Sequence, residues 1–331
     1  REDKEIDAII FDDAHTADSV LRDSFSLDIK ANNTTAVAYH LLAAEFRDYF
    51  HASGIGARYD EVINTDTRWT LILPPFEVRK RFSRITKILQ EANLHSSSET
   101  CFGWAHLKDH LDHCVYILSA GAITITPAIT PVRTLPYFQN QTRRVYLSAT
   151  LDAEDGFTRT FGKSPQLIIA PETTAGACER LILIPKHASD KPTDEIATSC
   201  DIIKNKKTLI LAPTYRRGQR WSEIATPPER EDVTAAVNQF KASNNPDKLL
   251  LTARYDGVDL PGDTCRVMVI DDLPSNTNPL ENFLWEFLRT SNSMRTTIAS
   301  RVVQCFGRIS RGMSDHGVVM ITGPSLIDWL A

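Results

Sequence analysis

The feature that most constrains the fold is a regular alternation of short apolar runs and longer helical stretches in the second half of the chain. Five short, mostly apolar runs are strand candidates: Leu181–Ile184, Thr208–Leu211, Leu249–Leu251, Val267–Ile270 and Val318–Ile321. Stretches with helical character separate most of them: 194–205, 214–224, 231–241 and 280–306. Such an alternation predicts a mostly parallel sheet with helices on both faces. We therefore predict an α/β domain over residues 176–331.

The first half of the chain shows the same pattern, interrupted by a long helical stretch. Ile6–Phe11 is a nearly continuous apolar run, which is typical of a buried parallel strand. From about residue 35, apolar residues recur at helical spacing. The pattern returns to strands in three runs: Cys114–Leu118, Ile123–Thr126 and Arg144–Leu147. We predict one α/β domain formed by residues 1–30 and 114–175, with residues 31–113 as a helical insertion.

Composition and charge exclude several classes of protein. Hydrophobic residues make up 42% and charged residues 24% of the 331 residues, so each part can bury a core and a disordered chain is excluded. The formal net charge of −5 gives no general sign of nucleic-acid binding, although a local basic groove is enough for that function. No apolar run approaches the length of a membrane span, so we expect no membrane partner.

Cysteine usage and the start of the chain indicate its setting. The six cysteines include no C-x-x-C pair, and a chain of this size does not need disulfide bonds for stability. We therefore expect reduced thiols and a cytoplasmic location. The chain begins at Arg1 without an initiator methionine and runs directly into the first strand. We interpret it as the C-terminal portion of a longer protein, whose missing N-terminal part is its partner in function.

Two adjacent carboxylates follow the first predicted strand, in the sequence Asp12-Asp13-Ala14-His15. Open α/β sheets bind ligands at the carboxyl ends of their strands. Carboxylates at this position suit a hydrated Mg²⁺ ion and the polarisation of a water molecule. In the structural alternative, Asp12 or Asp13 caps the start of a helix.

A second motif, Ser148-Ala149-Thr150, directly follows the predicted strand Val145–Leu147. Its position matches that of the first motif, because both come at the end of a strand of the same domain. So short a motif also has a structural interpretation, in which the hydroxyl groups cap the following turn.

A third segment, Gly257–Gly262, precedes the predicted strand Val267–Ile270 and the residues Asp271–Pro274. Its two glycines allow tight backbone turns, and Asp259 can accept hydrogen bonds from a ribose or a water molecule. The structural alternative is a Gly/Pro-rich turn between strands.

The last motif is Gln304–Arg311, with the sequence Q-C-F-G-R-I-S-R. Arg308 and Arg311 are three residues apart, so on a helix they share a face. Two guanidinium groups on one face can hold a triphosphate while charge develops on it. The structural alternative is a basic face exposed to solvent.

In content and order, these motifs resemble those of the superfamily 2 helicases, most closely of the XPD/DinG branch. Residues 12–15, D-D-A-H, are similar to that family's D-E-A-H box, and residues 148–150 to its S-A-T motif. Residues 257–262, G-V-D-L-P-G, and residues 304–311 are similar to its later motifs. The resemblance implies two RecA-like parallel-sheet lobes, the first truncated at its N-terminus, with the helical insertion in the place of the branch's arch domain. It also implies an ATP-dependent helicase or translocase that acts on nucleic acid, more specifically on single-stranded DNA.

The resemblance further implies roles for single residues, with ATP and Mg²⁺ as cofactors. Asp12 would hold Mg²⁺, and Asp13 stands where the family has a Glu that orients the attacking water. Arg308 and Arg311 would act on the phosphates as catalytic residues. Four residues would bind the nucleotide: Gly257, Asp259, Gln304 and Gly307. Four residues would couple the nucleotide site to nucleic acid: His15, Ser148, Ala149 and Thr150.

Two features depart from the family's pattern. Asp13 is one methylene shorter than the family's Glu, which shortens its reach to the water. The sequence contains no G-x-x-x-x-G-K-[ST] phosphate loop. Gly162-Lys163-Ser164 lacks the spacing and follows the S-A-T motif, so we interpret it as a surface turn. We therefore expect the chain alone not to hydrolyse ATP. Two other functions stay open: a nucleic-acid-stimulated ATPase that remodels complexes without separating strands, and a non-catalytic scaffold.

A run of basic residues lies in the predicted insertion: Arg79, Lys80, Arg81, Arg84 and Lys87. Such a run is most simply a solvated helix face, and the alternative is a contact with nucleic acid that salt would weaken. We expect it to contribute only weakly to binding.

Overall fold

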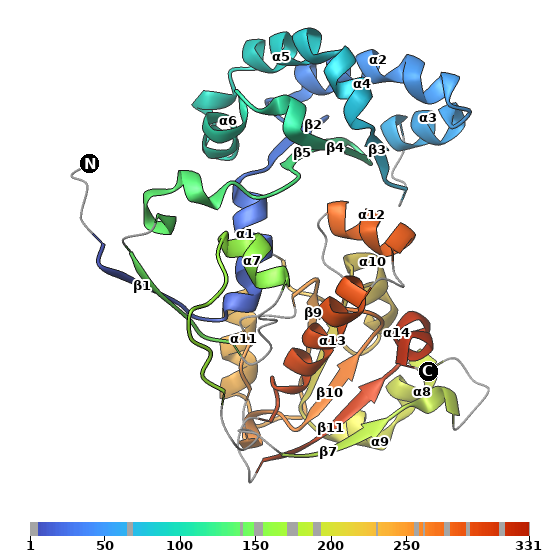
Figure 1. Cartoon of the computed structure of the whole chain (residues 1–331). Helices are drawn as coiled ribbons and strands as arrows, with labels where there is room; N and C mark the ends of the chain where they lie inside the picture. The colour runs from blue at the N-terminus through green and yellow to red at the C-terminus, as the bar shows by residue number, and fades with distance from the viewer. Residues whose placement is uncertain are drawn as a thin grey trace. The chain divides into compact units, whose positions relative to one another are not determined.

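The computed structural model of the chain divides into two compact units, Arg1–Ile168 (unit 1) and Ile169–Ala331 (unit 2) (Figure 1). The predicted boundary between the two lobes, at 175/176, lies slightly further along the chain. The structure describes these residues: 6–64, 69–139, 142–148, 155–170, 178–187, 193–229, 231–254, 258–260, 262–274, 279–288, 292–310 and 315–330. Among them, none of the helices has both the length and the apolar character that a bilayer crossing requires.

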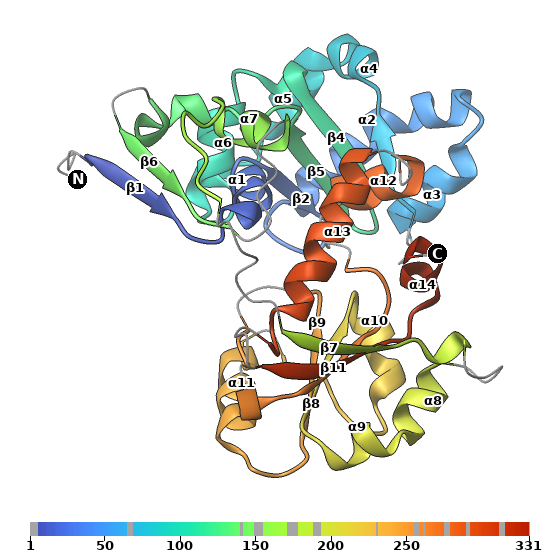
Figure 2. The same ribbon diagram turned by 60° about the horizontal axis from the view of Figure 1, so that its bottom comes forward.

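Unit 2 contains a five-stranded sheet in which every neighbouring pair of strands is parallel (Figures 1 and 2). In order across the sheet, its strands are β7 (Glu179–Leu183), β11 (His316–Ile321), β10 (Val267–Ile270), β8 (Thr208–Ala212) and β9 (Lys248–Thr252). Two of the three inner strands, β8 and β10, are buried along their whole length, as expected of strands covered on both faces. The five predicted strands and the parallel α/β fold are therefore confirmed.

Helices cover both faces of this sheet, and each face has its own core. On one face, Leu209 and Met268 pack with residues of α11 (Val233–Ala242), α13 (Asn292–Phe306) and α14 (Pro324–Leu330). The core of the other face includes residues of α8 (Thr193–Ser199), α9 (Asp201–Asn205) and the 3-10 turn η7 (Gln219–Trp221). The predicted helix 280–306 is two helices, because α12 (Pro279–Leu288) precedes α13.

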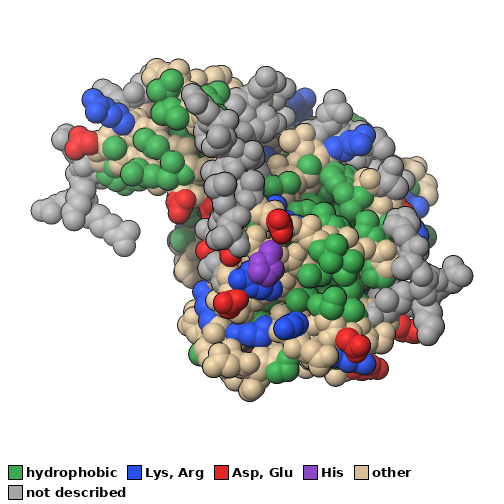
Figure 3. Space-filling model, turned by 90° about the horizontal axis from the view of Figure 1, so that it is seen from below, with side chains coloured by type: hydrophobic (Ala, Val, Ile, Leu, Met, Phe, Trp, Pro, Cys, Tyr) green, Lys and Arg blue, Asp and Glu red, His purple; other side chains and the backbone are tan. Residues whose placement is uncertain are grey.

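In unit 1, the strand of the first apolar run meets a strand from far along the chain. β1 (Ala8–Phe11) pairs in parallel with β6 (Arg143–Tyr146). One face of the pair packs on aromatic residues of the neighbouring segments, and the Phe11 and Tyr146 rings stack with centroids 5.0 Å apart. The opposite face exposes Ile10 (67%) and Val145 (49%). Figure 3 shows patches of hydrophobic side chains on the face of the molecule that it draws.

Two helices adjoin this parallel pair. α1 (Ala17–Ser24) follows the D-D-A-H residues through a 3-10 turn, η1 (Ala14–Thr16), and α7 (Asp155–Phe161) follows the S-A-T region. Phe157 and Phe161 of α7 are buried against the packed face of the strands. The last residues of β1 and β6 therefore pack against α7 on one face of the strand pair.

The insertion differs from the predicted helical domain, because it is built on a sheet. Four strands pair antiparallel in the order β2 (Leu27–Lys30), β5 (Ala122–Pro127), β4 (Cys114–Ser119) and β3 (Leu71–Leu73). Its helices are α2 (Ala36–Ala52), α3 (Gly56–Asn64), α4 (Pro75–Lys80), α5 (Phe82–Glu91) and α6 (Cys101–Leu107). Helix and sheet residues form one continuous core in which Phe46, Ile85 and Tyr116 are fully buried.

The predicted boundary of the insertion at 113/114 therefore separates two strands that pair, β3 and β4. The sequence pattern assigns 114–126 to the first α/β domain, whereas the structure places β4 and β5 in the antiparallel sheet. The physical reason is the connection between them. Ser119 pairs with Ala122, so only two residues make the turn, with Gly121 at φ 69°. A two-residue turn forces antiparallel pairing, while a parallel strand needs a long crossover.

Candidate functional site

The D-D-A-H residues lie at the carboxyl edge of the β1–β6 pair. Phe11 and Tyr146, the last residues of the two strands, are partners in the parallel register. Beyond them, the amide of Leu147 donates to the carbonyl of Phe11, and the amide of Ala14 donates to the carbonyl of Leu147, both at 2.9 Å. The first motif is thus adjacent to the residue that leads into the S-A-T motif. This edge is where open α/β sheets place ligands.

Both carboxylates of the first motif are exposed at this edge. The Asp13 backbone is left-handed, with φ 50° and ψ 47°, and its amide donates to Asp12 Oδ1 at 3.0 Å. Asp13 precedes η1, but its side chain makes no capping hydrogen bond there. The Asp13 carboxylate therefore does not cap the helix, as the structural alternative had it. Mg²⁺ is commonly held by one or two carboxylates together with water and phosphate oxygens, and this donor set fits that requirement.

The coupling residues are only partly described. His15 belongs to η1, but its side chain lies outside the described part of the structure. Ser148 is half-buried beside the first motif, and Ala149 and Thr150 fall outside the described residues.

In unit 2, the structure brings the third and fourth motifs together. Leu260, from the G-V-D-L-P-G segment, is fully buried, and its amide donates to the carbonyl of Arg308 at 2.9 Å. Asp259 is its neighbour, and Gln304 lies on the last turns of α13. The two segments, far apart in sequence, are therefore joined by a backbone hydrogen bond. Gly257 lies outside the described residues.

The local structure around Arg308 differs from the predicted helical face. α13 ends at Phe306, one residue before Gly307, and the amide of Arg308 donates to the carbonyl of Cys305 in a turn. Helices commonly end at a glycine, which explains why the helical spacing does not continue. Arg308 is only 6% exposed, so its alternative role in a solvated basic face is wrong. Arg311 lies outside the described residues.

Comparisons with known proteins bear on these motifs. Residues 198–327 match the family model described as the helicase C-terminal domain. The chain is 21% identical over 236 residues to the ATP-dependent DNA helicase DinG of Photobacterium profundum, a match that covers 66% of this chain and 34% of that protein. Over the matched residues this chain is similar in sequence to that helicase. It spans about a third of the length of the curated relative that it matches.

Solved structures support the XPD-like fold over nearly the whole chain. An XPD helicase structure aligns with a TM-score of 0.60 and 14% identity, covering 97% of this chain and 65% of that one. An apo XPD structure aligns with a TM-score of 0.57 and 14% identity, covering 99% of this chain and 75% of that one. Xpd4 of S. tokodaii aligns with a TM-score of 0.52 and 13% identity, covering 98% and 72%. At these identities the likeness concerns the fold.

Unit 2 also contains a buried cluster that the sequence motifs do not reveal. Asp271, the residue after β10, is fully buried. Its carboxylate accepts hydrogen bonds from Arg217 Nε and Nη2 at 2.7–3.0 Å and from Trp221 Nε1 at 2.8 Å. Thr322 Oγ1 donates to it at 3.2 Å. The sequence pattern places Asp271 and Thr322 directly after predicted strands and Arg217 and Trp221 on the segment after a third, but it does not show that their side chains meet.

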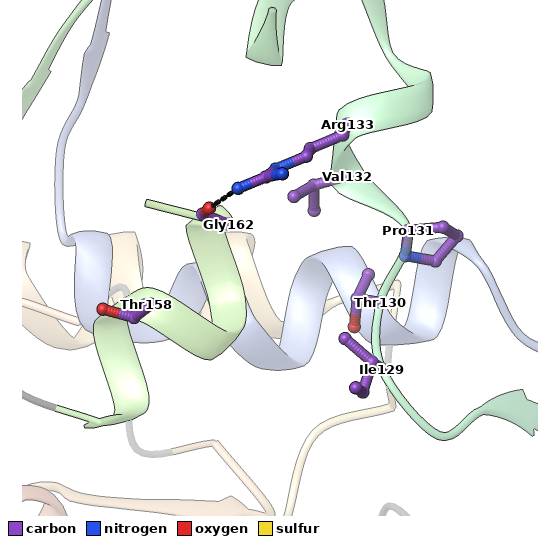
Figure 4. Close-up of a pocket in the computed structure, with 7 residues that line it drawn as sticks. All are labelled: Ile129, Thr130, Pro131, Val132, Arg133, Thr158 and Gly162. Carbon is purple, nitrogen blue, oxygen red and sulfur yellow. Dashed lines mark hydrogen bonds between the residues drawn. The ribbon is translucent and has the colours of Figure 1, made fainter. Parts of the chain in front are cut away.

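The Gly162-Lys163-Ser164 segment is placed unlike a phosphate loop. Gly162 follows the carboxyl end of α7 with φ 74°, and its carbonyl accepts a hydrogen bond from the guanidinium of Arg133 (Figure 4). Phosphates bind at the amino ends of helices, where amide groups point outward, and not at carboxyl ends. An open pocket of about 580 Å³ lies beside this contact, lined by Ile129–Arg133, Thr158 and Gly162. The surface-turn interpretation of the segment is consistent with this geometry.

Ion pairs with acidic residues offset much of the positive charge of the basic run in the insertion. Arg81 is nearly buried and contacts Glu77 and Glu45. Arg84 also pairs with Glu45 at 3.2 Å, and Lys80 pairs with Glu77 at 3.7 Å. These carboxylates lower the positive potential that a nucleic acid would meet, so the run suits packing of α4 and α5 better than binding.

Proposed function

We propose that the whole protein is an ATP-dependent DNA helicase and that this chain supplies one part of its nucleotide site. The observation that carries the proposal is the adjacency of the D-D-A-H residues and the S-A-T lead-in, through the hydrogen bond between Ala14 and Leu147. A helicase must pass a change at the nucleotide to its nucleic-acid groove. A backbone hydrogen bond at a sheet edge, between the first motif and the residue that precedes the second, is suited to that task.

The residues of this chain have separate tasks in the proposal. Asp12 would hold the metal through its exposed carboxylate, and Asp13 would orient the water that attacks the terminal phosphate. Bound Mg²⁺ supplies positive charge next to the phosphate oxygens. By the resemblance, Arg308 and Arg311 would act on the phosphates, and Gly257, Asp259, Gln304 and Gly307 would bind the nucleotide. The nucleic-acid partner is single-stranded DNA.

The proposal includes a phosphate-binding loop in a part of the protein that precedes this chain. Two observations support it: no G-x-x-x-x-G-K-[ST] sequence occurs in the 331 residues, and the match to the DinG relative covers only 34% of that protein. A cytoplasmic location belongs to the proposal as well, supported by the six cysteines, which are all free thiols in the structure.

The test is to measure phosphate release and strand displacement by the whole protein, with single-stranded DNA and with a forked duplex. We expect both activities, and we expect Asp12→Asn to abolish both while leaving the fold intact by circular dichroism. Asp109→Asn serves as the control, because Asp109 is an exposed carboxylate of unit 1 outside the motifs. Phosphate release without strand displacement would indicate a remodelling ATPase instead. The absence of both would indicate a scaffold.

A further inference from the structure

The Asp271 cluster ties together the segments that leave three neighbouring strands of unit 2. Its donors Arg217 and Trp221 lie on the segment after β8, and Thr322 follows β11. Asp271 itself follows β10, and its amide donates to the carbonyl of Leu211 in β8 at 2.8 Å. A fully buried carboxylate is tolerated only with partners of this kind, and losing one partner is costly. The cluster therefore fixes the carboxyl edge of the sheet as one rigid body.

The segment after β8 is pressed closely onto the sheet by this cluster. It consists of the short helix α10 (Tyr215–Gly218) and η7, and Thr214 Oγ1 accepts from the amide of Arg217 at 3.1 Å. A Cβ on Gly218 would lie 2.8 Å from the methyl group of Thr252 in β9. Trp221 is fully buried. The inner side of the segment thus has little freedom to shift.

The outer side of the same segment has a different character. Tyr215 is 53% exposed, and Arg216 and Arg220 are exposed too. An exposed ring suits stacking on a base, and guanidinium groups suit the phosphates of a nucleic-acid strand. The cluster holds this outer side in place through the residues next to it in sequence.

Backbone strain is concentrated at the same edge. Ala253, after β9, has φ 52°, and Asp272, after β10, has φ 79°. Non-glycine residues rarely adopt such angles, and they persist where the surrounding structure enforces them, often at functional sites. The strained residues and the buried cluster therefore lie on the ends of neighbouring strands.

We propose that Asp271 is a positioning residue for nucleic-acid binding. Through Arg217 and Trp221 it holds α10 so that Tyr215 and Arg216 contact one strand of nucleic acid. The inference rests on the proposed helicase function, because the strand is the substrate of that function.

The test measures binding of a labelled oligothymidylate to the whole protein by fluorescence anisotropy over a series of salt concentrations. Arg217→Lys keeps the charge but lacks the planar fork that makes two hydrogen bonds. We expect it to weaken binding about tenfold, the effect of losing one stacked base or its equivalent. The surface double variant Tyr215→Ala/Arg216→Gln should weaken binding to a similar degree without lowering the thermal unfolding temperature. It should also reduce the slope of log affinity against log salt by about one.

A matched control separates positioning from general destabilisation. Arg301 makes a two-pronged ion pair with Glu281 between α13 and α12 and also donates to the carbonyl of Pro274, so it lies in the same unit but on a different helix from Arg217. Arg301→Lys should lower the unfolding temperature as Arg217→Lys does, yet bind the oligonucleotide like the unaltered protein. Equal loss of binding in both variants, or unchanged binding in the surface double variant, would overturn the inference. If the unaltered protein bound no oligonucleotide, the proposed function would fail, and this inference with it.

Discussion

At the residue scale, the backbone of Asp13 explains why an aspartate suits this position. Its φ of 50° is left-handed, and the carbonyl of Asp13 accepts hydrogen bonds from the amide and the hydroxyl of Thr16. The left-handed conformation costs most residues about 1–2 kcal/mol, and Asp and Asn tolerate it best. The shorter side chain therefore has a local structural reason, apart from its reach toward a water molecule.

We expect Asp13→Glu to preserve ATP turnover by the whole protein or raise it, because the longer side chain reaches the water more easily. The unfolding free energy of this variant should fall by less than about 1 kcal/mol, because the unaltered protein already carries most of the cost of the left-handed backbone at this position. Asp13→Asn is the control, since it keeps the backbone preference but removes the charge, and it should lose turnover. A Glu variant that folds and binds ATP but does not turn over would contradict the assignment of Asp13.

Arg311 gives a cleaner catalytic test than Arg308, because Arg308 is buried and its removal would also destabilise unit 2. We expect Arg311→Ala to lower ATP turnover by about 10³–10⁵-fold with little effect on nucleotide binding, as for arginines that face transition-state charge. Arg295→Ala, at an exposed position of α13, should behave like the unaltered protein. Steady-state phosphate release and nucleotide titration are the measurements. Turnover of the Arg311 variant within a few-fold of normal would remove Arg311 from the site.

At the scale of elements, the ends of β10 and β11 approach so closely that a side chain does not fit between them. A Cβ on Gly323 would lie 2.1 Å from the Cα of Asp272, and backbone atoms cannot yield as a flexible side chain can. This contact, with the Asp271 cluster, explains how the carboxyl edge of unit 2 keeps its shape.

We expect Gly323→Ala to lower the unfolding free energy by about 3 kcal/mol or more, at the upper end of overpacking effects. The control is Gly262→Ala in the same unit, where φ is 60° but the nearest atom would be 3.9 Å away. It carries only the left-handed strain of about 1–2 kcal/mol. Urea denaturation followed by tryptophan fluorescence compares the two. Equal losses of unfolding free energy in the two variants would mean that β10 and β11 separate easily at this point.

The helices α4 and α5 allow a sharper test of the basic run than removal of all its charges. Arg81 supports packing, so it stays unchanged, while Arg79, Lys80, Arg84 and Lys87 are replaced by Gln. Because exposed charges are screened by salt and three of these four residues have acidic neighbours, we expect binding of single-stranded DNA to weaken less than about threefold at physiological salt. Loss of binding would make the insertion a main contact with nucleic acid.

At the scale of the whole molecule, residues 1–331 contain only part of what ATP hydrolysis requires. Backbone amides and a lysine must surround the phosphates while the metal and the arginines approach from other sides. In the proposed function this chain contributes Asp12 and the arginines of the last motif, and Gly162-Lys163-Ser164 lies at the wrong end of a helix to bind phosphate. The exposed apolar face of the β1–β6 pair, with Ile10 and Val145, also favours association of the chain with further copies of itself.

We therefore expect purified residues 1–331 to release no phosphate from ATP, with or without single-stranded DNA and at any magnesium concentration. The chain should also self-associate in analytical ultracentrifugation. Robust turnover that disappears in Lys163→Ala would show that the Gly162 segment is a phosphate loop. Turnover that survives this change would place the loop elsewhere in the chain.

The sequence by itself determined the parallel sheet of unit 2 and the strand that carries the D-D-A-H residues. Both follow from local patterns, since a buried strand is a short apolar run and its partners alternate with helices. The motifs at strand ends were readable for the same reason, because a residue that directly follows a strand lies at the sheet's ligand-binding edge.

Only the tertiary structure decided the rest. Leu27–Lys30 and Leu71–Leu73 join the Cys114–Pro127 hairpin in one antiparallel sheet, and no local pattern predicts which distant strands will pair. The burial of Arg308 depends on where α13 ends, and a helical spacing does not show that end. Asp271 meets Arg217, Trp221 and Thr322 because three strands run side by side. Side chains adjacent in space but separated by 50 or more residues leave no periodic signal, so their contacts exist only once the sheet has formed.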